Sequence, residues 1–442
     1  MKGWDATRVA AAAGATLVRA APGAPERVVI DSREAGPGDL FVGLVGENAD
    51  GGRFAARALE AGAWGVLVGP SWAELGGGGA VLAAGDPLAA LGALARDWRR
   101  SLGAAVIAVT GSVGKTSTKE LVTALVAPHR AVSASRANFN TDIGMPLEIL
   151  AAPVGTEVLV LEAAMRGFGE IATLAAICEP DVGVITNIGP VHLEQVGSLE
   201  GVARAKGELL EGMRDGGTAV VPAGEPLLDR YLRDGLAVVR FGAGGDVELD
   251  GDVVVAGGER LDLELPFTSR HQRVNALAAV AAARAIGVHP SGRLEVSFGA
   301  LRGERVALAS GATVINDCYN ASPLSVRAAL DDLASQPLTG RRIAVLGDML
   351  ELGDAEQQLH REIGSAAEAA GVEVLVTVGR RAAAMLDEFD GESYAVADAA
   401  EAASLTGELI EAGDVVLVKG SRGVGLEVVA EALVAAAEVP HG

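Results

Sequence analysis

The segment AVIAVTGSVGKTSTKEL, Ala105–Leu121, decides how the surrounding chain folds. An apolar run rich in β-branched residues leads into a glycine-containing turn, and a segment of helical pattern follows. This strand–loop–helix order is what a phosphate-binding loop requires. Glycines let backbone N–H groups turn toward phosphate oxygens, and the N-terminus of the helix adds its positive end. We therefore expect a nucleotide site built from Gly111, Ser112, Val113, Gly114, Lys115 and Thr116.

Two residues of this loop have expected chemical roles. Lys115 is placed to reach the β- and γ-phosphates, and Thr116 to offer its hydroxyl to Mg²⁺. Val109 stands where the usual pattern has its first glycine, so the loop departs from the strict form. An ordinary glycine-rich turn is the alternative, but the Gly-Lys-Thr sequence between a strand and a helix favours nucleotide binding.

Working outward, strand and helix patterns alternate on both sides of the loop. Short apolar runs such as EVLVLEAA, DVGVITNIG and TAVVPAG end at glycine, proline or polar residues, which is typical of a parallel sheet covered on both faces. The same rhythm restarts with ATVIND and continues to DVVLVKG, with a helix that has Ser322 as its N-cap and Pro323 at its first position. We expect an α/β protein with a central parallel-sheet P-loop domain and a Rossmann-like C-terminal domain.

Length and composition set the number and class of the domains. A chain of 442 residues suggests about three domains, at roughly 150 residues each. The predicted boundaries are 1–88, 89–306 and 307–442. The composition, with 50% hydrophobic and 21% charged residues, is that of a globular protein.

The net charge is 36 − 58 = −22, and such a field repels nucleic-acid backbones, so we expect no nucleic-acid partner. Only two cysteines occur, Cys178 and Cys318, which excludes a disulfide framework or thiolate metal site. The first twenty residues carry charges throughout and no run reaches the ~18 uncharged apolar residues of a membrane span. We expect a cytoplasmic protein without membrane insertion, and a monomer.

Of three further polar residues, Glu162 is the one that its position in the sequence favours for metal chemistry. Glu162 follows four apolar residues at the end of a strand, where ligands gather in open parallel sheets and where a hard cation finds an oxygen ligand. His192 follows a strand and a Gly-Pro turn, but a lone loop histidine is usually just exposed. Lys206 lies on a predicted helix, where a lysine normally faces solvent, and composition assigns it no role.

Taken together, the motifs resemble the Mur ligase family, from DSREAGPGDLFVGL in the first block to KGSRG near the end of the chain. The motifs between them are TGSVGKTS, NFN, LEAAMRGFGEI, NIGPVHLEQVGS, KGELL, NALAA, NDCYNASP and LGDMLELG. Within the family, the chain is most similar to the members that join D-alanyl-D-alanine to UDP-N-acetylmuramoyl-tripeptide. The resemblance implies an ATP-dependent ligase of peptidoglycan precursor synthesis that works through an acyl phosphate.

The resemblance also implies roles for single residues. ATP phosphates and one magnesium would be held by Lys115 and Thr116, with Glu162 and His192 as magnesium ligands. Lys206 matches a lysine that is carbamylated and then holds a second Mg²⁺. The implied nucleotide contacts are Asn275 and Arg302 in the central domain and Asp317, Tyr319 and Asn320 in the third. The implied catalytic residues are Lys115, His192, Lys206 and Arg302, and the implied substrate-binding residues are Ser32, Arg33, Lys419, Ser421 and Arg422.

Several positions depart from the family pattern. Gly52 replaces a frequent histidine in the first domain. Thr141, Gln272 and Ser322 each stand where the pattern has asparagine. Arg305 competes with Arg302 for the arginine role, and the spacing to Asp317 favours Arg302.

Two other classes of function stay open at the level of sequence. One is a sister enzyme, either another muramoyl-peptide ligase or a ligase similar to folylpolyglutamate synthase. The other is an ATP-driven switch of the P-loop type, which would hydrolyse ATP without an acceptor and would not need Lys206, His192 and the NDCYNASP segment.

Overall fold

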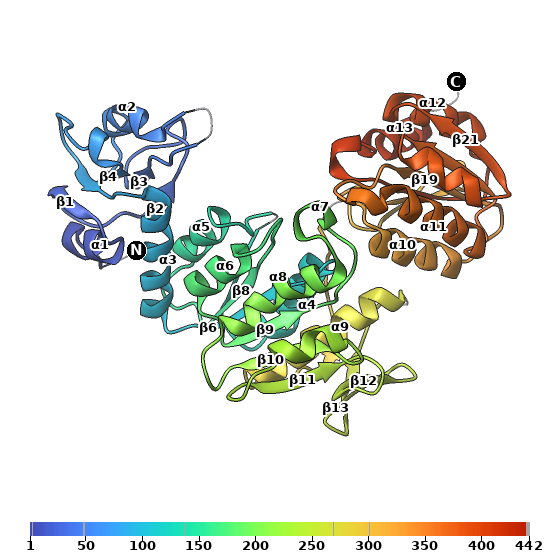
Figure 1. The fold of residues 1–442 in the computed structure, drawn as a ribbon, viewed down its shortest axis with the longest axis horizontal. Helices are drawn as coiled ribbons and strands as arrows, with labels where there is room; N and C mark the ends of the chain where they lie inside the picture. The colour runs from blue at the N-terminus through green and yellow to red at the C-terminus, as the bar shows by residue number, and fades with distance from the viewer. Residues whose placement is uncertain (2, 47–48, 137, 268, 300, 439–442) are drawn as a thin grey trace.

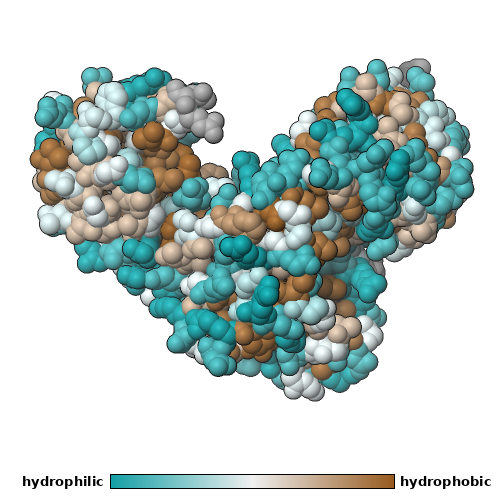
Figure 2. Space-filling model, in the orientation of Figure 1, coloured by the Kyte–Doolittle hydropathy of each residue, from teal (hydrophilic) through white to brown (hydrophobic). Residues whose placement is uncertain are grey.

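The computed structural model describes residues 1, 3–46, 49–136, 138–267, 269–299 and 301–438, and the chain forms three α/β lobes (Figure 1). The first and third lobes lie at opposite ends of the central lobe, and Figure 2 shows the wide opening between them. The prediction of three α/β units around a central P-loop sheet is confirmed.

The first lobe is built on a five-stranded sheet of order β1-β5-β4-β3-β2, in which only β1 is antiparallel to its neighbour. Its elements are α1 (Ala6–Ala12), β1 (Thr16–Arg19), β2 (Arg27–Val29), β3 (Asp39–Val42), η1 (Gly51–Phe54), α2 (Ala55–Glu60), β4 (Gly65–Val68), η2 (Pro70–Trp72) and β5 (Ala80–Ala83). All four residues of β3 and of β4 are buried, as expected for strands covered on both faces.

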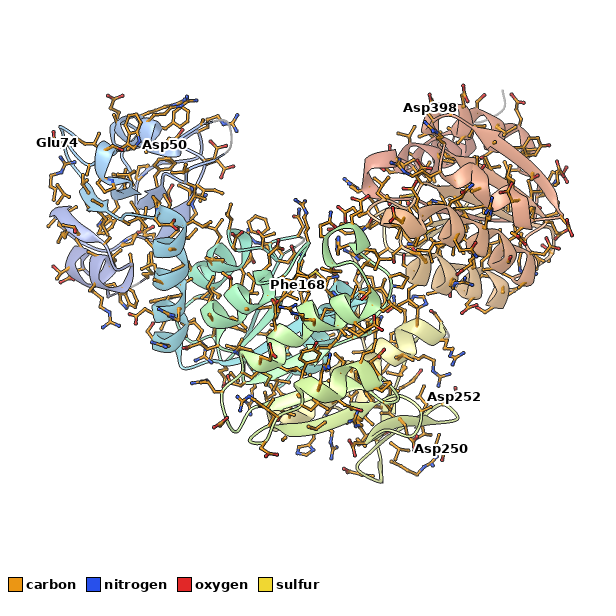
Figure 3. All side chains as sticks on the ribbon, viewed as in Figure 1. Asp50, Glu74, Phe168, Asp250, Asp252 and Asp398 are labelled. Atoms are coloured by element: carbon orange, nitrogen blue, oxygen red, sulfur yellow. The ribbon has the colours of Figure 1, made fainter. Side chains whose placement is uncertain are left out.

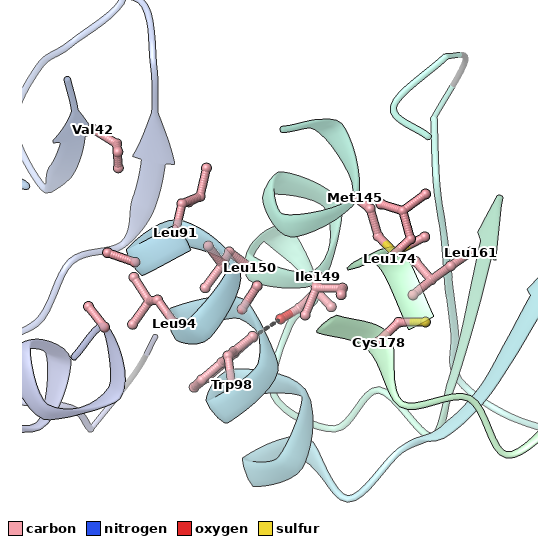
Figure 4. Packing of buried hydrophobic residues seen from close by; sticks show 14 of the residues in the cluster. Val42, Leu91, Leu94, Trp98, Met145, Ile149, Leu150, Leu161, Leu174 and Cys178 are labelled. Atoms are coloured by element: carbon pink, nitrogen blue, oxygen red, sulfur yellow. Dashed lines mark hydrogen bonds between the residues drawn. The ribbon is translucent and has the colours of Figure 1, made fainter. Parts of the chain in front are cut away.

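Helix α3 (Pro87–Leu102) joins the first lobe to the central one. Asp86 caps its start by accepting hydrogen bonds from two backbone N–H groups, and Pro87 fills the first helical position. Leu91 and Leu94 belong to the same buried cluster as Val42 of the first lobe and Ile149 of the central lobe (Figure 4). Because the two lobes share one hydrophobic core through α3, the first lobe is packed against the central one rather than tethered to it.

The central lobe has a nine-stranded sheet of order β14-β13-β12-β11-β10-β9-β6-β8-β7. Its elements are β6 (Ala105–Thr110), α4 (Lys115–Val126), β7 (Val132–Ala134), α5 (Gly144–Ala151), β8 (Val158–Glu162), α6 (Glu170–Cys178), β9 (Val182–Ile185), α7 (Leu193–Val196), α8 (Leu199–Glu211), β10 (Thr218–Pro222), η3 (Pro226–Tyr231), β11 (Ala237–Phe241), β12 (Val247–Asp250), β13 (Val253–Ala256), β14 (Glu259–Arg260) and α9 (Arg270–Ala285), with a separate pair of short strands, β15 (Leu263–Glu264) and β16 (Gly292–Arg293).

Alternation along β6 explains how both faces of this sheet are covered. Val106 and Ala108 belong to the buried cluster that contains residues of α5, α6 and α8, whereas Ile107 and Val109 belong to the cluster that contains residues of α4 and α9. Successive side chains of a strand point to opposite faces, so one strand serves two cores.

The predicted parallel sheet is present, and antiparallel strands extend it at one edge, so the whole sheet is mixed. Strands β7 to β12 run parallel, but β13 and β14 continue the edge in antiparallel pairs. The short turn Asp250–Val253 cannot hold the helix that a parallel crossover needs, so it returns the chain as a hairpin.

The third lobe has a six-stranded sheet of order β17-β18-β22-β19-β20-β21, parallel except for the edge strand β17. Its elements are β17 (Glu304–Ala307), β18 (Thr313–Asn316), α10 (Pro323–Ser335), β19 (Arg342–Gly347), η4 (Gly353–Ala355), α11 (Glu356–Ala369), β20 (Val374–Val378), η5 (Ala382–Glu388), β21 (Glu392–Val396), α12 (Ala399–Leu409), β22 (Val415–Lys419), η6 (Arg422–Val424) and α13 (Glu427–Glu438). Ser322 caps α10 and Pro323 is its first residue, which confirms the predicted start of this helix.

The boundaries of the domains remain proposals. The break expected at residue 306 falls inside β17, which pairs with β18 in the third sheet. We therefore propose to draw this boundary just before β17. Within the described part of the chain, no helix combines the length and the apolar character needed to cross a bilayer.

Candidate functional site

The predicted phosphate loop connects β6 to the start of α4. Gly111 has φ 150° and Gly114, the N-cap of α4, has φ 81°, and both values favour glycine. A Cβ atom on Gly111 would lie 1.8 Å from Oγ1 of Thr186, and one on Gly114 would lie 2.6 Å from Oδ1 of Asn275. The two glycines are therefore required by close packing as well as by the backbone turn.

Residues that follow β9 hold the loop in shape. Asn187 accepts a hydrogen bond from the N–H of Val113 at 2.9 Å, and its amide donates to the Val113 carbonyl at 3.0 Å. Thr186 donates to the same carbonyl at 2.6 Å, and Ser112 donates to the carbonyl of Gly189 at 3.0 Å. Sequence reasoning missed Thr186 and Asn187, although their position at the end of a strand beside β6 was a signal that could have identified them.

Lys115 lies over the loop. Its Nζ donates to the carbonyl of Gly111 at 2.9 Å and to that of Ser112 at 3.4 Å. Burial lowers the pKa of Lys115, Glu162 acts in the opposite direction, and Arg302 lowers it further. Among the residues that the structure describes, no carboxylate forms an ion pair with this ammonium. A phosphate is the kind of anion that would stabilise its charged form.

Oxygen donors gather at the end of β8. Thr116 donates through Oγ1 to Oε2 of Glu162 at 2.7 Å, and Asn140 donates to Oε1 of the same carboxylate at 2.9 Å. Glu162 is 3% exposed, and its backbone N–H is held by Ser135 at 3.0 Å. A buried carboxylate beside a phosphate-loop hydroxyl is a donor set that suits Mg²⁺, so these residues fit the metal that the sequence predicts. Asn140 belongs to the NFN motif, and its contact with Glu162 was not foreseen.

His192 and Lys206 approach the same site from α7 and α8. Lys206 is 2% exposed, and burial, followed by the nearby charge of Lys115, holds the pKa of Lys206 well below its ordinary value. Burial also lowers the pKa of His192; Glu351 opposes this, and Lys206 and Lys115 add to it. The charge of Lys115 thus acts on the pKa of both Lys206 and His192, and that of Lys206 acts on the pKa of His192.

The acidic and histidine ligands of this site are few. Across the described ranges, no three or more His, Cys, Asp or Glu side chains form a group that could hold a metal ion. Glu162 and His192 are the two predicted ligands of these types, and Lys206 is a further predicted ligand.

The two competing arginines have different surroundings. The guanidinium carbon of Arg302 lies 3.7 Å from the ring centroid of Tyr319, and Arg302 is close enough to Lys115 to lower its pKa. Arg305 instead donates to Asp332 of α10 at 2.7 Å. The structure thus brings the charge of Arg302 within reach of Lys115 and holds Arg305 within the third lobe, which favours Arg302 for the predicted role.

Asn275 is buried under the loop, and its amide donates to Gln272 at 3.4 Å. In the third lobe, Nζ of Lys419 donates to Oδ2 of Asp317 at 2.6 Å and to the carbonyl of Asn320 at 2.9 Å. These contacts place Lys419, Asp317 and Asn320 together at the carboxyl ends of β18 and β22.

The other two predicted substrate-binding residues of the third lobe, Ser421 and Arg422, differ in exposure. Ser421 is 4% exposed and accepts a hydrogen bond from the N–H of Leu350 at 3.0 Å. The side chain of Arg422 is 61% exposed and lies 3.8 Å from a carboxylate oxygen of Glu427. Ser421 therefore has a structural contact, whereas Arg422 faces solvent.

The first-lobe candidates lie apart from the phosphate loop. Ser32 is buried, but the side chain of Arg33 is 77% exposed and pairs with Asp31, and this hydrogen bonding lowers the pKa of Asp31 to about 2. Both residues belong to the first lobe at one end of the molecule (Figure 1). The structure does not bring them to the site of Lys115, so they can serve it only through a substrate long enough to reach both lobes.

The departure at Gly52 has a physical reason. A Cβ atom on Gly52 would lie 2.3 Å from Cδ1 of Trp72, whose indole N–H donates to Asp50 at 2.7 Å. Asp50 also accepts from the N–H of Gly52 at 2.9 Å, in the first lobe as drawn in Figure 3. The tryptophan ring fills the space in which a larger residue at position 52 would begin.

The phosphate loop and the Thr116–Glu162 pair of oxygen donors lie together at the carboxyl edge of the central sheet. Two further α/β lobes flank this sheet. These features define a multidomain protein that binds a nucleoside triphosphate. The profile of the Mur ligase middle domain matches residues 109–283, and that of the Mur ligase, glutamate ligase domain matches residues 301–422. The UDP-N-acetylmuramoyl-tripeptide–D-alanyl-D-alanine ligase of Bacillus subtilis (strain 168) is 35% identical over 424 residues, covering 92% of this chain and 93% of that protein. The chain belongs to the Mur ligase family.

Solved structures agree with this assignment. A crystal structure of MurF from Acinetobacter baumannii superimposes with a TM-score of 0.89 at 30% identity, over 98% of this chain and 99% of that one. The MurF ligase from Thermotoga maritima in complex with ADP superimposes with a TM-score of 0.84 at 28% identity, over 93% and 98% of the two chains.

Proposed function

We propose that this protein is an ATP-dependent ligase that joins D-alanyl-D-alanine to UDP-N-acetylmuramoyl-tripeptide in the synthesis of peptidoglycan precursors. The observation that carries the proposal is the assembly of Lys115, the Thr116–Glu162 pair and the buried Lys206 at the end of one sheet. The similarity to ligases of this specificity over 92% of the chain supports the choice of substrates.

The chemistry explains why the site needs cations around a phosphate loop. A carboxylate does not react with an amine because oxide is a poor leaving group. The peptide carboxylate therefore attacks the γ-phosphorus of ATP; an O–P bond forms, the bond to the β-phosphate oxygen breaks, and ADP leaves. The amine of D-alanyl-D-alanine then attacks the acyl phosphate carbon, a proton passes to solvent or a base, and inorganic phosphate departs as the amide forms.

Phosphoryl transfer depends chiefly on positioning and on neutralisation of charge. The loop N–H groups and Lys115 would hold the β- and γ-phosphates, and Arg302, just before the third lobe, would add positive charge. When bound, Mg²⁺ would offset negative charge on the phosphate oxygens, held by Thr116, Glu162 and His192. In a chain of net charge −22, these local cations are what make the binding of several anions favourable.

We also propose that Lys206 is carbamylated. Burial lowers its pKa, so a larger fraction of the side chain is the neutral amine that reacts with carbon dioxide. The amine nitrogen forms a bond to the carbon of CO₂ and loses a proton, which yields a carbamate with two oxygens. This group would supply an oxygen ligand and hold a second Mg²⁺.

The remaining predicted site residues have proposed contacts that differ from lobe to lobe. Asn275, Asp317, Tyr319 and Asn320 would contact the nucleotide, and Ser32 and Arg33 the uridine nucleotide of the first substrate. Lys419, Ser421 and Arg422 would act near the acceptor peptide in the third lobe. We propose that the protein acts as a monomer in the cytoplasm, where ATP is supplied.

Phosphate release measured with each substrate left out in turn tests the function. We expect rapid release only when UDP-N-acetylmuramoyl-tripeptide and D-alanyl-D-alanine are both present with Mg²⁺ and ATP. Equal release without an acceptor would contradict the proposal and favour an ATP-driven switch. Release with a single amino acid in place of the dipeptide would indicate a sister ligase.

Removal of dissolved carbon dioxide tests the carbamate. Activity should fall in bicarbonate-free buffer and recover when bicarbonate is added. Activity that does not depend on bicarbonate, together with an unmodified Lys206 in intact-protein mass spectra, would contradict carbamylation and leave the ligase proposal standing.

A further inference from the structure

A side chain of the third lobe contacts the predicted metal ligand of the central lobe. Nδ1 of His192 forms a hydrogen bond with Oε2 of Glu351, which lies 159 residues further along the chain. The His192 side chain is 26% exposed and the Glu351 side chain is 41% exposed. Glu351 belongs to the LGDMLELG motif, to which the chemistry proposed above assigns no role.

Both partners of this contact have an unusual backbone conformation. Among the residues that the structure describes, four that are not glycine have positive φ, and they include His192 at 52° and Glu351 at 64°. A third, Leu301 at 63°, lies where the chain passes into the third lobe. Such conformations cost free energy and persist where the surroundings fix them, so both ends of this contact are held in place by the fold.

The loop that carries Glu351 is pinned by its own lobe. The N–H of Met349 donates to Nε2 of the buried His360 at 3.0 Å, and the N–H of Leu350 donates to Ser421 at 3.0 Å. His360 donates through Nδ1 to the carbonyl of Glu356 at 2.7 Å, which fixes Nε2 as the acceptor. Glu351 therefore extends from a rigid platform rather than from a mobile loop.

The contact is also backed by backbone packing between the lobes. A Cβ atom on Gly353 would lie 3.5 Å from the backbone nitrogen of Glu194, so η4 of the third lobe touches α7 of the central lobe. Figure 1 shows α7 on the side of the central lobe that faces the third lobe. The His192–Glu351 hydrogen bond thus lies within a junction of the two lobes.

We propose that Glu351 is a positioning residue for His192, and that docking of the third lobe thereby completes the metal site of the central lobe. This inference rests on the metal site of the proposed function. A histidine that ligates a metal commonly donates its second ring N–H to a carboxylate, which fixes the tautomer and the orientation of the ring. With Nδ1–H directed to Glu351, Nε2 is left for the metal.

The consequence is a coupling between domain position and activation of the substrate. Glu162 and Thr116 are held by each other within the central lobe, whereas the ring of His192 is contacted by a residue of the third lobe. The metal site would then be complete only when the lobe that carries Lys419 and Asp317 is docked. Formation of a hydrolysable acyl phosphate would be confined to that state.

Substitutions at Glu351 test this proposal in the full-length protein, with Glu194→Gln as a matched control. Glu194 is an exposed carboxylate on α7 at the same junction, and it makes no hydrogen bond to His192. The affinity for Mn²⁺, a spectroscopic substitute for Mg²⁺, is measured by electron paramagnetic resonance in the presence of a non-hydrolysable ATP analogue. We expect Glu351→Ala to weaken Mn²⁺ binding about 10- to 100-fold. Glu351→Gln should give a smaller loss because its amide oxygen still accepts from Nδ1–H, and Glu194→Gln should have no effect.

A metal-free measurement addresses the histidine itself. In spectra of ¹⁵N-histidine-labelled protein, the wild type should show His192 with its proton on Nδ1, and Glu351→Ala should shift it toward the Nε2-protonated form. Glu351→Gly distinguishes the loss of the carboxylate from a change in backbone strain, because glycine adopts the φ of 64° without strain. The Gly variant should show the same loss of Mn²⁺ affinity as the Ala variant.

Unchanged Mn²⁺ affinity and an unchanged His192 tautomer in Glu351→Ala would overturn the proposal. A rise in ligase activity in that variant would also overturn it, because the contact would then be an inhibitory latch. Failure of the proposed function would look different from failure of this inference. In that case the wild-type protein itself would show no acceptor-dependent phosphate release, independently of any substitution at Glu351.

Discussion

The nucleotide site of the central lobe and the proposed uridine site of the first lobe are built in different ways. In the central lobe, the carboxylate of Glu162 is buried and receives hydrogen bonds from Thr116 and Asn140. In the first lobe, the guanidinium of Arg33 is exposed and pairs with its near neighbour Asp31. The central-lobe site is preorganised by buried tertiary contacts, whereas Arg33 of the first-lobe site is exposed and contacts only a near neighbour in sequence.

This difference predicts which substitutions stop the reaction and which only weaken binding. A group held in a preorganised site stabilises the transition state, so its loss lowers kcat. A group on an exposed loop contributes mainly to binding of the ground state, so its loss raises KM.

The largest effect is expected at Lys115. Lys115→Ala should lower kcat by about 100- to 1,000-fold, because the ammonium lies at the loop where the phosphates are proposed to bind. Stability should be nearly unchanged, since burial disfavours this charge in the folded protein. Steady-state kinetics and thermal denaturation measure the two effects. Arg33→Ala is the matched change in the first lobe and should raise the KM for the nucleotide-linked peptide while kcat is retained.

Arg302 and Arg305, on either side of the proposed boundary between the central and third lobes, test this comparison further. Arg302→Ala should raise the KM for ATP by roughly 10-fold, because its guanidinium lies beside Tyr319 and within reach of the loop. Arg305→Ala should leave the KM for ATP unchanged and reduce stability by about 0–1 kcal/mol through loss of its partly exposed pair with Asp332. The opposite order of effects on KM would show that the role belongs to Arg305.

Position 52 tests the packing of the first lobe. Gly52→His should lower the free energy of unfolding by about 1–3 kcal/mol, because its Cβ would meet the ring of Trp72. Denaturant titration measures this, and the double variant Gly52→His/Trp72→Ala should recover part of the loss. Wild-type stability in the single variant would show that the tryptophan ring moves freely and that the departure from the family pattern is not a packing constraint.

The smallest effect is expected in the third lobe, at His360. The side chain is fully buried, and burial holds its pKa below the ordinary value near 6.5. The unfolded chain therefore takes up the proton first as the pH falls. The contribution of neutral His360 to the free energy of unfolding is fully present above about pH 6.5. Below that pH it is lost by at most about 1.4 kcal/mol per pH unit. Replacement by Gln should reduce the slope of stability against pH in this range, and an unchanged slope would contradict the assignment.

The sequence predicted those parts of the site that depend on local order. The loop Gly111–Thr116 and the carboxylate of Glu162 follow strands directly, and the carboxyl ends of neighbouring parallel strands meet at one edge. The same reasoning predicted three α/β units and the N-cap of α10.

What the sequence did not predict depends on contacts between distant segments. Asn187 clamps the loop from 74 residues away, and Glu351 reaches His192 across 159 residues. No local pattern reports which polar side chain will meet another after folding. The antiparallel edge of the central sheet was missed because β13 and β14 are short and end in turn residues rather than helices.

Transfer of oxygen from the substrate to phosphate tests the central claim most directly. With ¹⁸O in the terminal carboxylate of the tripeptide, the protein is supplied with ATP, Mg²⁺ and D-alanyl-D-alanine, and the released phosphate is analysed by mass spectrometry. An acyl phosphate held at the loop predicts that each phosphate released in amide formation carries one oxygen from that carboxylate. Amide formation with phosphate that contains no ¹⁸O would contradict activation of the carboxylate by the γ-phosphoryl group.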